Sequence, residues 1–225
     1  MKKISLFAWS FLILSISCSH NQQKPTENAS HDNKIPASQK KNIVFFGNSL
    51  TAGYGLEDLS QGFVSLTQNK LDSLHLNYNC INAGLSGETT AGGKERISWI
   101  ASQQSIDIFI LELGGNDALR GIMPNVSIQN LQSIIDVVKA KNKDVKIILA
   151  GMQAPPQMGK DYTGAFKAMY PTLAEKNKIG LIPFILEGVG GIPQLNQKDG
   201  IHPTPEGNKI VAQTIWNYLQ KEIIQ

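Results

Sequence analysis

Residues 42–56 read NIVFFGNSLTAGYGL, and this segment indicates the fold class more clearly than any other. Its first five residues are mostly apolar and β-favouring, a composition that predicts a buried strand. Gly47 and the small polar residues after it are typical of a turn that caps a following helix. A buried strand that leads through a glycine turn into a helix is the repeating unit of an α/β fold.

The same alternation of strand and helix patterns continues to the end of the chain. Short apolar runs predict strands at residues 42–46, 77–82, 106–111, 145–150 and 180–183. Amphipathic patterns predict helices at residues 62–74, 89–103, 127–141, 163–176 and 205–222. This order predicts one domain with a parallel sheet, helices on both faces and right-handed crossovers.

In such a sheet, ligands bind outside the carboxyl ends of the strands, so the loops after the strands are where a site is expected. Four loops contain unusual residues. They are residues 47–51 (GNSLT), 83–88 (AGLSGE), 114–117 (GGND) and 199–203 (DGIHP). The first loop matches neither the phosphate-binding glycine motifs nor the G-x-S-x-G elbow of α/β-hydrolases.

A serine that attacks a carbonyl needs a base for its proton and a carboxylate that orients the base. Of the four histidines, His20 and His31 precede the folded part, and His75 lies at the end of an amphipathic helix, where a solvated role is expected. His202 is left as the base. Asp199 precedes it by three residues, in a loop with Gly200 and two prolines, so one short segment supplies both groups to Ser49.

Hydrogen-bond donors for the developing oxyanion complete such a site. The candidates are the backbone N–H of Gly84, the side-chain amide of Asn116 and the backbone N–H of Ser49. Each residue alone also has an ordinary explanation, because Gly84 could serve a turn with positive φ and Asn116 a helix cap. Their joint occurrence after successive strands favours the functional interpretation.

Ser49, Gly84, Asn116 and His202 resemble the four residues after which the SGNH (GDSL) hydrolases are named. The segments FGNSLTAGYGL at residues 46–56 and LELGGND at residues 111–117 look like the bacterial arylesterase, acyl-CoA thioesterase I and lysophospholipase branch. So do residues 162–173 with the IPF segment at 182–184. The resemblance extends from about residue 42 to the C-terminus.

The resemblance implies a flavodoxin-like three-layer sandwich that cleaves esters or thioesters through an acyl-enzyme, without metal or organic cofactor. It makes Ser49 the nucleophile, His202 the base, Asp199 its orienter, and Gly84 and Asn116 oxyanion donors. The substrate would be a small-molecule ester, thioester or lysophospholipid, and the enzyme a monomer. The usual Gly-Asp-Ser-Leu is Gly-Asn-Ser-Leu here, and we expect activity to survive Asn48, with an altered pH profile.

Two alternatives remain at this point. A carbohydrate O-deacetylase of the same superfamily would use the same triad on acetylated glycans. A catalytically inactive surface-binding lipoprotein would keep the fold, with Asn48 as the mark of lost catalysis.

The N-terminus predicts export. Residues 1–17 combine two lysines with an apolar run, as signal peptides do. Cys18 follows this run as in a bacterial lipobox and would be acylated, anchoring the protein to a membrane of the cell envelope through its lipid chains. Ordinary signal-peptide cleavage, giving a soluble secreted or periplasmic protein, is the alternative. The polar residues after Cys18, up to Lys41, predict a disordered tether before a domain at 42–225.

Composition narrows the classes of partner. The 225 residues are 41% hydrophobic and 17% charged, which suits one globular domain plus a tail. The formal net charge is +3, of which Lys2 and Lys3 would leave with the signal peptide, so no nucleic-acid partner is indicated. With Cys18 acylated, Cys80 would be the one thiol of the folded part, and we expect it to be a small buried hydrophobe in a strand.

The loop after the fourth expected strand, residues 151–161, contains Met152 and Met158 among prolines and glycines. Methionine is apolar and adaptable, which suits a groove for acyl chains of several lengths. We therefore expect Met158 to contact the acyl chain. A purely structural loop, with Met152 covering the core, is the alternative.

Overall fold

The computed structural model describes residues 40–224. The predicted signal peptide, Cys18 and the tether up to residue 39 lie outside the described residues, so this division of the chain stays a prediction. The described part contains five parallel strands in the order β2-β1-β3-β4-β5. The strands are β1 (Lys41–Gly47), β2 (Tyr78–Gly84), β3 (Ile108–Glu112), β4 (Lys146–Ala150) and β5 (Gly180–Ile182).

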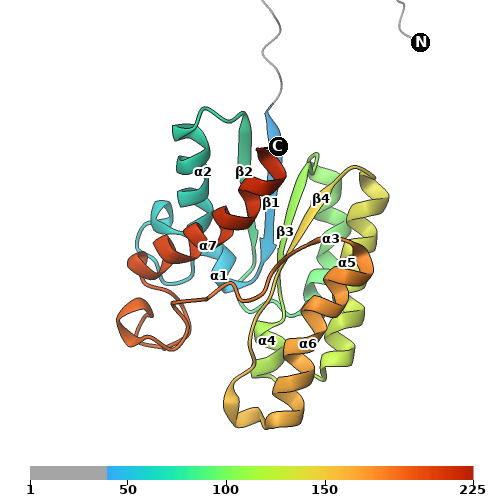
Figure 1. The fold of residues 1–225 in the computed structure, drawn as a ribbon, viewed down its shortest axis with the longest axis vertical. Coiled ribbons are helices and arrows are strands. Elements are labelled where there is room, and N and C mark those ends of the chain that lie inside the picture. Colours follow the sequence, from blue (N-terminus) through green and yellow to red (C-terminus); the bar gives the residue numbers. More distant parts are fainter. Residues whose placement is uncertain (1–39, 225) are drawn as a thin grey trace, which may run out of the picture. The chain divides into compact units, whose positions relative to one another are not determined.

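Helices cover both faces of this sheet (Figure 1). One face carries α1 (Ser49–Ala52), α2 (Phe63–Ser73) and α7 (Pro205–Ile223), and the other carries α3 (Thr90–Gln103), α5 (Pro124–Lys141) and α6 (Lys160–Asn177). The short helix α4 (Gly115–Leu119) follows β3. The three-layer α/β sandwich predicted from the sequence is therefore confirmed.

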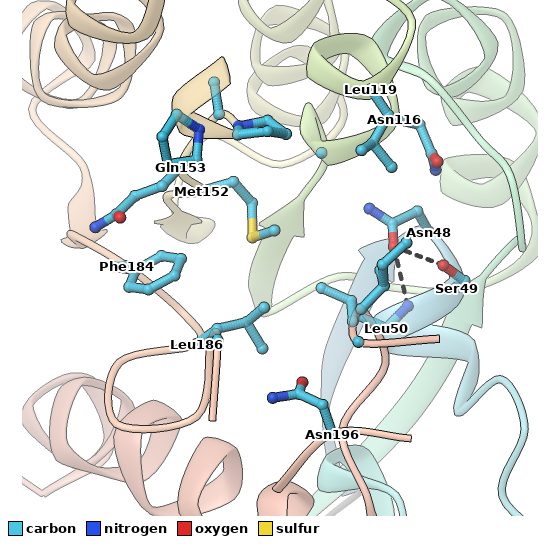
Figure 2. A pocket seen from close by; sticks show the side chains of 18 residues that line it. Asn48, Ser49, Leu50, Asn116, Leu119, Met152, Gln153, Phe184, Leu186 and Asn196 are labelled. Atoms are coloured by element: carbon cyan, nitrogen blue, oxygen red, sulfur yellow. Dashed lines mark hydrogen bonds between the residues drawn. The ribbon is translucent and has the colours of Figure 1, made fainter. Parts of the chain in front are cut away.

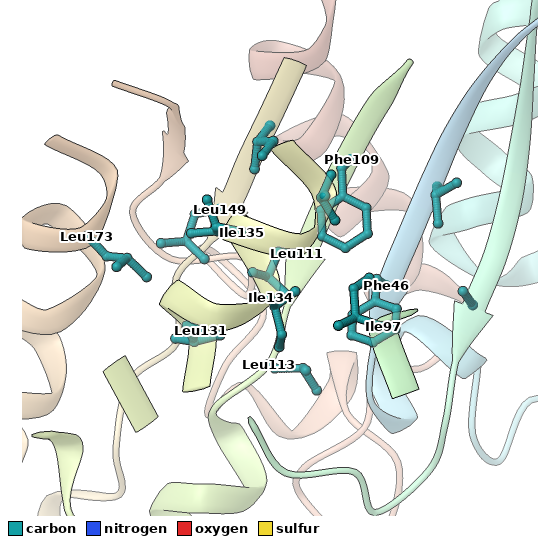
Figure 3. Packing of buried hydrophobic residues seen from close by; sticks show 14 of the residues in the cluster. Phe46, Ile97, Phe109, Leu111, Leu113, Leu131, Ile134, Ile135, Leu149 and Leu173 are labelled. Carbon is teal, nitrogen blue, oxygen red and sulfur yellow. The ribbon is translucent and has the colours of Figure 1, made fainter. Parts of the chain in front are cut away.

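Two hydrophobic cores result from the alternation of side chains along the buried strands. In β1, Val44 and Phe46 belong to the core under α3, α5 and α6, whereas Ile43 and Phe45 belong to the core under α2 and α7. Figure 3 shows the first core, where Phe46 and Phe109 lie near Ile97 of α3 and Ile134 of α5. Both faces of the strand are buried, which explains why its sequence is a continuous apolar run.

The strand order places the loops of the expected site together. Strand β1 lies between β2 and β3, and in this register Gly47 pairs with both Gly84 and Glu112. The chain leaves β1 toward β2 and later returns to β3 on the other side, so the strand order reverses at β1. A crevice at the carboxyl ends of β1, β2 and β3 is the expected consequence.

The long elements lie where the sequence predicts them, with ends displaced by one to a few residues. The predicted helix ranges do not include the short helices α1 and α4 or the 3₁₀ turns η1 (Leu59–Gln61), η2 (Pro156–Met158) and η3 (Pro193–Leu195). Elements of three to five residues are too short to show a hydrophobic period, so pattern analysis misses them. No helix among residues 40–224 is both long and apolar enough to span a bilayer.

The positions and exposure of Cys80 and His75 are close to those predicted. Cys80 lies in β2 and carries a free thiol, and burial raises its pKa to about 12. It is partly rather than fully buried because β2 is the edge strand of the sheet. His75 is exposed just after α2.

Candidate active site

Ser49, His202 and Asp199 form one hydrogen-bonded chain at the carboxyl end of β1. His202 Nε2 lies 2.8 Å from Ser49 Oγ, and His202 Nδ1 lies 2.6 Å from Asp199 Oδ2. Ser49 is the first residue of α1, whereas the other two residues precede α7. This arrangement can pass the serine proton to the imidazole while the carboxylate stabilises the imidazolium.

Asp199 also shapes the loop that carries His202. Its Oδ1 accepts hydrogen bonds from the backbone N–H of Ile201 at 2.9 Å and of His202 at 3.1 Å. Gly200 has φ +69°, a conformation that favours glycine. Burial opposes the ionised carboxylate of Asp199, but the hydrogen bonds from the His202 ring and the two N–H groups outweigh it and lower its pKa to about 2.

Tyr54 is a site residue that the sequence did not single out. Its ring lies 4.7 Å from the His202 ring, centroid to centroid. The Tyr54 carbonyl accepts a hydrogen bond of 2.8 Å from Gln197 Nε2, and the Gln197 N–H donates to the His202 carbonyl at 2.7 Å. Tyr54 and Gln197 therefore add to Asp199 in restricting the position of the imidazole.

Asn116 lies in α4, which is fixed by a buried carboxylate next to it. Asp117 accepts hydrogen bonds from the Thr90 N–H at 2.9 Å, the Thr90 hydroxyl at 2.5 Å and the Ser127 hydroxyl at 2.8 Å. These contacts join α4 to α3 and α5. The Asn116 amide donates to the Glu88 carbonyl at 2.9 Å, so it lies beside the loop that follows β2.

Gly84 does not have the role that the sequence predicted for it. Its N–H donates to Asn82 Oδ1 at 2.9 Å, so it is not free to bind an oxyanion. Its φ is not positive either. A Cβ at this position would overlap the backbone of Thr51 and Ala52. Gly84 is therefore required because α1 packs directly on the end of β2.

Gly87 is the glycine of this loop whose N–H is available. It has φ +80°, and no hydrogen bond of its N–H occurs among residues 40–224. The next residue is Glu88, whose carbonyl accepts the hydrogen bond from the Asn116 amide. The Glu88 carboxylate is buried and paired with Arg96, which also donates to the Ala83 carbonyl at 2.9 Å. Sequence reasoning missed Gly87 because Gly84 and Gly87 stand in one short segment, residues 83–88, and nothing in that segment shows which N–H is bonded.

Asn48 connects the site to a buried acid. Its side-chain Nδ2 donates to Glu112 Oε1 at 2.8 Å, and its Oδ1 accepts from the Leu50 N–H at 2.9 Å. The Ser49 hydroxyl lies 3.4 Å from the same Oδ1. Burial raises the pKa of Glu112 to about 7, although hydrogen bonds from Thr51 and Asn48 act in the opposite direction.

A cleft of about 410 Å³ opens beside Ser49. Figure 2 shows Ser49 and Asn116 on one side of it and Met152, Phe184 and Leu186 on the other. Within the described part of the chain, no Lys, Arg, Asp or Glu lines this cleft. Asn196 lines it too, and its Oδ1 is the buried side-chain acceptor without a hydrogen-bond partner among residues 40–224.

The two methionines of the loop after β4 differ in position. Met152 lines the cleft and also packs against both hydrophobic cores. Met158 is not among the lining residues and instead lies near Gly121. The prediction that Met158 contacts the acyl chain is therefore not supported by this geometry, and Met152 is the methionine of this loop that lines the cleft.

Metal binding has no candidate among residues 40–224, where no three His, Cys, Asp or Glu side chains come together in a way that could hold an ion. The chemistry available at the cleft is that of Ser49, His202, Asp199 and the polar groups around them.

Comparison with known proteins gives the same result as the geometry. Residues 45–210 match the GDSL-like lipase/acylhydrolase family. Esterase TesA of Pseudomonas aeruginosa is 39% identical over 79% of this chain and 87% of its own length. Thioesterase 1/protease 1/lysophospholipase L1 of Escherichia coli is 34% identical, over 82% of this chain and 86% of its own.

The fold agrees as well. A crystal structure of TesA superposes with a TM-score of 0.77 at 37% identity, covering 82% of this chain and all of that one. The chain therefore belongs to the GDSL-like lipase/acylhydrolase family, the SGNH hydrolases, and is a carboxylic ester hydrolase.

Proposed function

We propose that this protein cleaves esters or thioesters of apolar acyl chains through an acyl-enzyme on Ser49. The observation that carries the proposal is the hydrogen-bonded chain from Asp199 through His202 to Ser49, with distances of 2.6 and 2.8 Å, at the edge of an uncharged cleft. A nucleophile, a base and an orienting carboxylate in contact are the arrangement that serine acyl transfer requires.

In acylation, Ser49 Oγ attacks the acyl carbonyl carbon while His202 Nε2 takes the hydroxyl proton. The resulting tetrahedral intermediate carries its negative charge on the former carbonyl oxygen. When the bond to the leaving oxygen or sulfur breaks, His202 gives its proton to the departing alcohol or thiol. The acyl group then remains as an ester of Ser49.

In deacylation, a water molecule attacks the acyl carbon and His202 takes its proton. The second tetrahedral intermediate collapses by breaking the bond to Ser49 Oγ, which receives the proton from His202. The carboxylic acid leaves and Ser49 is restored. Asp199 stays ionised in both steps and orients the imidazole.

The oxyanion donors in this proposal are the Asn116 amide and the backbone N–H groups of Ser49 and Gly87. Neither N–H group has a hydrogen-bond partner within residues 40–224. Asn116 is held beside the Gly87 loop by its bond to the Glu88 carbonyl. Donors that are already oriented stabilise the charge of the intermediate without reorganisation.

The lining of the cleft and the names of the relatives support the proposed substrate class. Met152, Phe184 and Leu186 offer an apolar wall, which suits an acyl chain better than a sugar. The relatives are named esterase, thioesterase and lysophospholipase. We include single-chain phospholipids among the substrates, because the proposed membrane anchor would hold the enzyme near them.

A panel of p-nitrophenyl esters from acetate to decanoate, with lysophospholipids and acetylated sugars, tests the proposal on the chain from Lys41 onward. We expect higher kcat/KM for medium chains than for acetate, and no turnover by Ser49→Ala. Preference for acetylated sugars would instead identify a carbohydrate O-deacetylase. Absence of both turnover and labelling by a fluorophosphonate probe would identify an inactive binding protein.

We further propose that Cys18 is acylated and anchors the enzyme to a membrane of a bacterial cell envelope. The support is the sequence of residues 1–18 alone. Bacteria that express the full chain and are fed an alkyne palmitate should give a labelled, membrane-associated protein, and Cys18→Ala should give neither. Unlabelled soluble wild-type protein would show that ordinary signal-peptide cleavage occurs.

A further inference from the structure

Glu112 is a buried carboxylate surrounded by donors. Its Oε1 accepts from Asn48 Nδ2 at 2.8 Å, and its Oε2 accepts from the Thr51 hydroxyl at 2.9 Å and the Asn48 N–H at 3.2 Å. Its side chain is only 1% exposed. Gly47 leaves room for this carboxylate, because a Cβ there would lie 2.5 Å from Oε2. All three donors belong to the segment that carries Ser49.

These contacts leave one orientation for the Asn48 amide. With Nδ2 toward Glu112, Oδ1 is placed to accept from the Leu50 N–H and lies beside the Ser49 hydroxyl. The reverse orientation would oppose Oδ1 to the carboxylate and Nδ2 to the Leu50 N–H, which pairs acceptor with acceptor and donor with donor. Asn48 is 3% exposed, so water cannot relieve such a mismatch.

We infer that Glu112 is a positioning residue for Ser49, acting through Asn48, and that this pair works because residue 48 donates to residue 112. The inference rests on the proposed role of Ser49 as nucleophile. Misplacing a nucleophile by about 1 Å is enough to reduce a rate about 100-fold. A structural role alone would lower stability without this specific dependence on which side chain donates.

The GDSL pattern of the family has an aspartate where this chain has Asn48. A carboxyl group at that position, facing Glu112, would bring two carboxyl groups to hydrogen-bond distance, and they could bond only by sharing a proton. With Asn48 the donor is a permanent N–H. The wild-type pair is therefore complementary when Glu112 is ionised, whereas a pair of carboxyl groups is complementary only while one proton is retained.

Few titratable groups face this pair in the described part of the chain. Tyr170 of α6 interacts with Glu112 and donates to the Leu113 carbonyl at 3.0 Å, and burial raises its pKa well above the usual value, so it stays neutral. From α1 the neighbours are Thr51 and Ser49, the latter bonded to His202. No cation is bonded to Glu112 among residues 40–224.

Exchanging donor and acceptor tests the inference. In Glu112→Gln, the NH₂ group introduced at position 112 would face the NH₂ group of Asn48, donor against donor. We therefore expect kcat to fall about tenfold or more with little change in KM. In the double variant N48D/E112Q, the amide introduced at position 112 donates to the carboxylate introduced at position 48 and still accepts from Thr51. This double variant should recover kcat to within about threefold of wild type.

The pH profile provides an independent readout. N48D alone should be active near neutral pH but lose kcat as pH rises, because the shared proton leaves. Wild type should hold its activity over that range, and N48D/E112Q should hold it as well, since neither pair shares a proton.

Controls separate this inference from a loss of folding. Thr67→Val removes a buried hydroxyl that donates to the Phe63 carbonyl in α2 at 2.7 Å, and it should lower Tm without changing kcat. Equal kcat for wild type and E112Q, or failure of a folded double variant to recover, would overturn the inference. If wild type itself shows no Ser49-dependent turnover, the proposed function fails instead.

Discussion

The three residues of the proposed triad should differ in what their removal costs. Ser49→Ala and His202→Ala should each remove nearly all turnover, about 10⁶-fold, whereas Asp199→Asn should leave roughly 10- to 100-fold more activity because an orienter contributes less. Steady-state kcat on a p-nitrophenyl ester measures this. Retention of more than about a tenth of the wild-type rate by Ser49→Ala would exclude Ser49 as nucleophile.

Asn116 is expected to act mainly in the transition state. Removing its amide with Asn116→Ala should lower kcat by about 10²- to 10³-fold with little change in KM, because the charge it stabilises develops only there. Separate determination of kcat and KM checks the prediction. A change confined to KM would make Asn116 a substrate-binding residue.

Between elements, the contact of α1 with β2 sets the requirement at Gly84. A Cβ there would meet the backbone of Ala52, so Gly84→Ala should lower the free energy of unfolding by about 1–3 kcal/mol. Denaturant titration measures this change in the free energy of unfolding. At Gly164 a Cβ meets nothing within 4 Å, so Gly164→Ala is the matched control and should not destabilise. An unchanged unfolding midpoint for Gly84→Ala would contradict this packing.

The loop between β4 and α6 predicts a difference between two methionines. Met152→Ala should reduce activity on octanoyl esters more than on acetate, since each buried CH₂ contributes about 0.8 kcal/mol. Met158→Ala should not change this ratio, because Met158 does not line the cleft. The ratio of kcat/KM for the octanoyl ester to that for the acetate ester checks this prediction. If neither variant changed this ratio from its wild-type value, the loop would have a structural role only.

For the folded domain as one unit, two carboxylic acids with shifted pKa values, Glu112 and Asp199, make stability depend on pH. The pKa of Glu112 rises from 4.5 to about 7 through burial, so its contribution to stability is present below pH 4.5 and is lost as pH rises through about 7. The corresponding free energy is about 3 kcal/mol. Asp199 has the opposite sign, and its contribution is lost as pH falls from 3.8 toward 2.

Urea unfolding of wild type and E112Q between pH 5 and 8 isolates the Glu112 contribution. As pH rises, wild type should lose unfolding free energy relative to E112Q, because only wild type has a carboxyl group at position 112 that ionises. A difference independent of pH would show that Glu112 does not change its protonation in this range.

Local patterns in the sequence were enough to predict the fold class and to name most residues of the candidate site. The apolar run of β1 and the periods of the helices predicted the alternating order, and that order implies a parallel sheet with loops gathered at one edge. Ser49, Asp199, His202 and Asn116 were predicted because each stands in a short motif of recognisable chemistry. Ser49 and His202 are 153 residues apart in sequence, and the topology of the sheet brings them into contact.

Only the tertiary structure shows which polar groups already have hydrogen-bond partners and which are free. Gly84 ends β2 and Gly87 lies in the loop after it. The N–H of Gly84 donates to Asn82, whereas the N–H of Gly87 has no hydrogen bond within residues 40–224. The position of Tyr54 on the His202 ring and the bond between Asn48 and Glu112 join segments far apart in sequence. Such contacts depend on strand register and side-chain direction, which no local pattern contains.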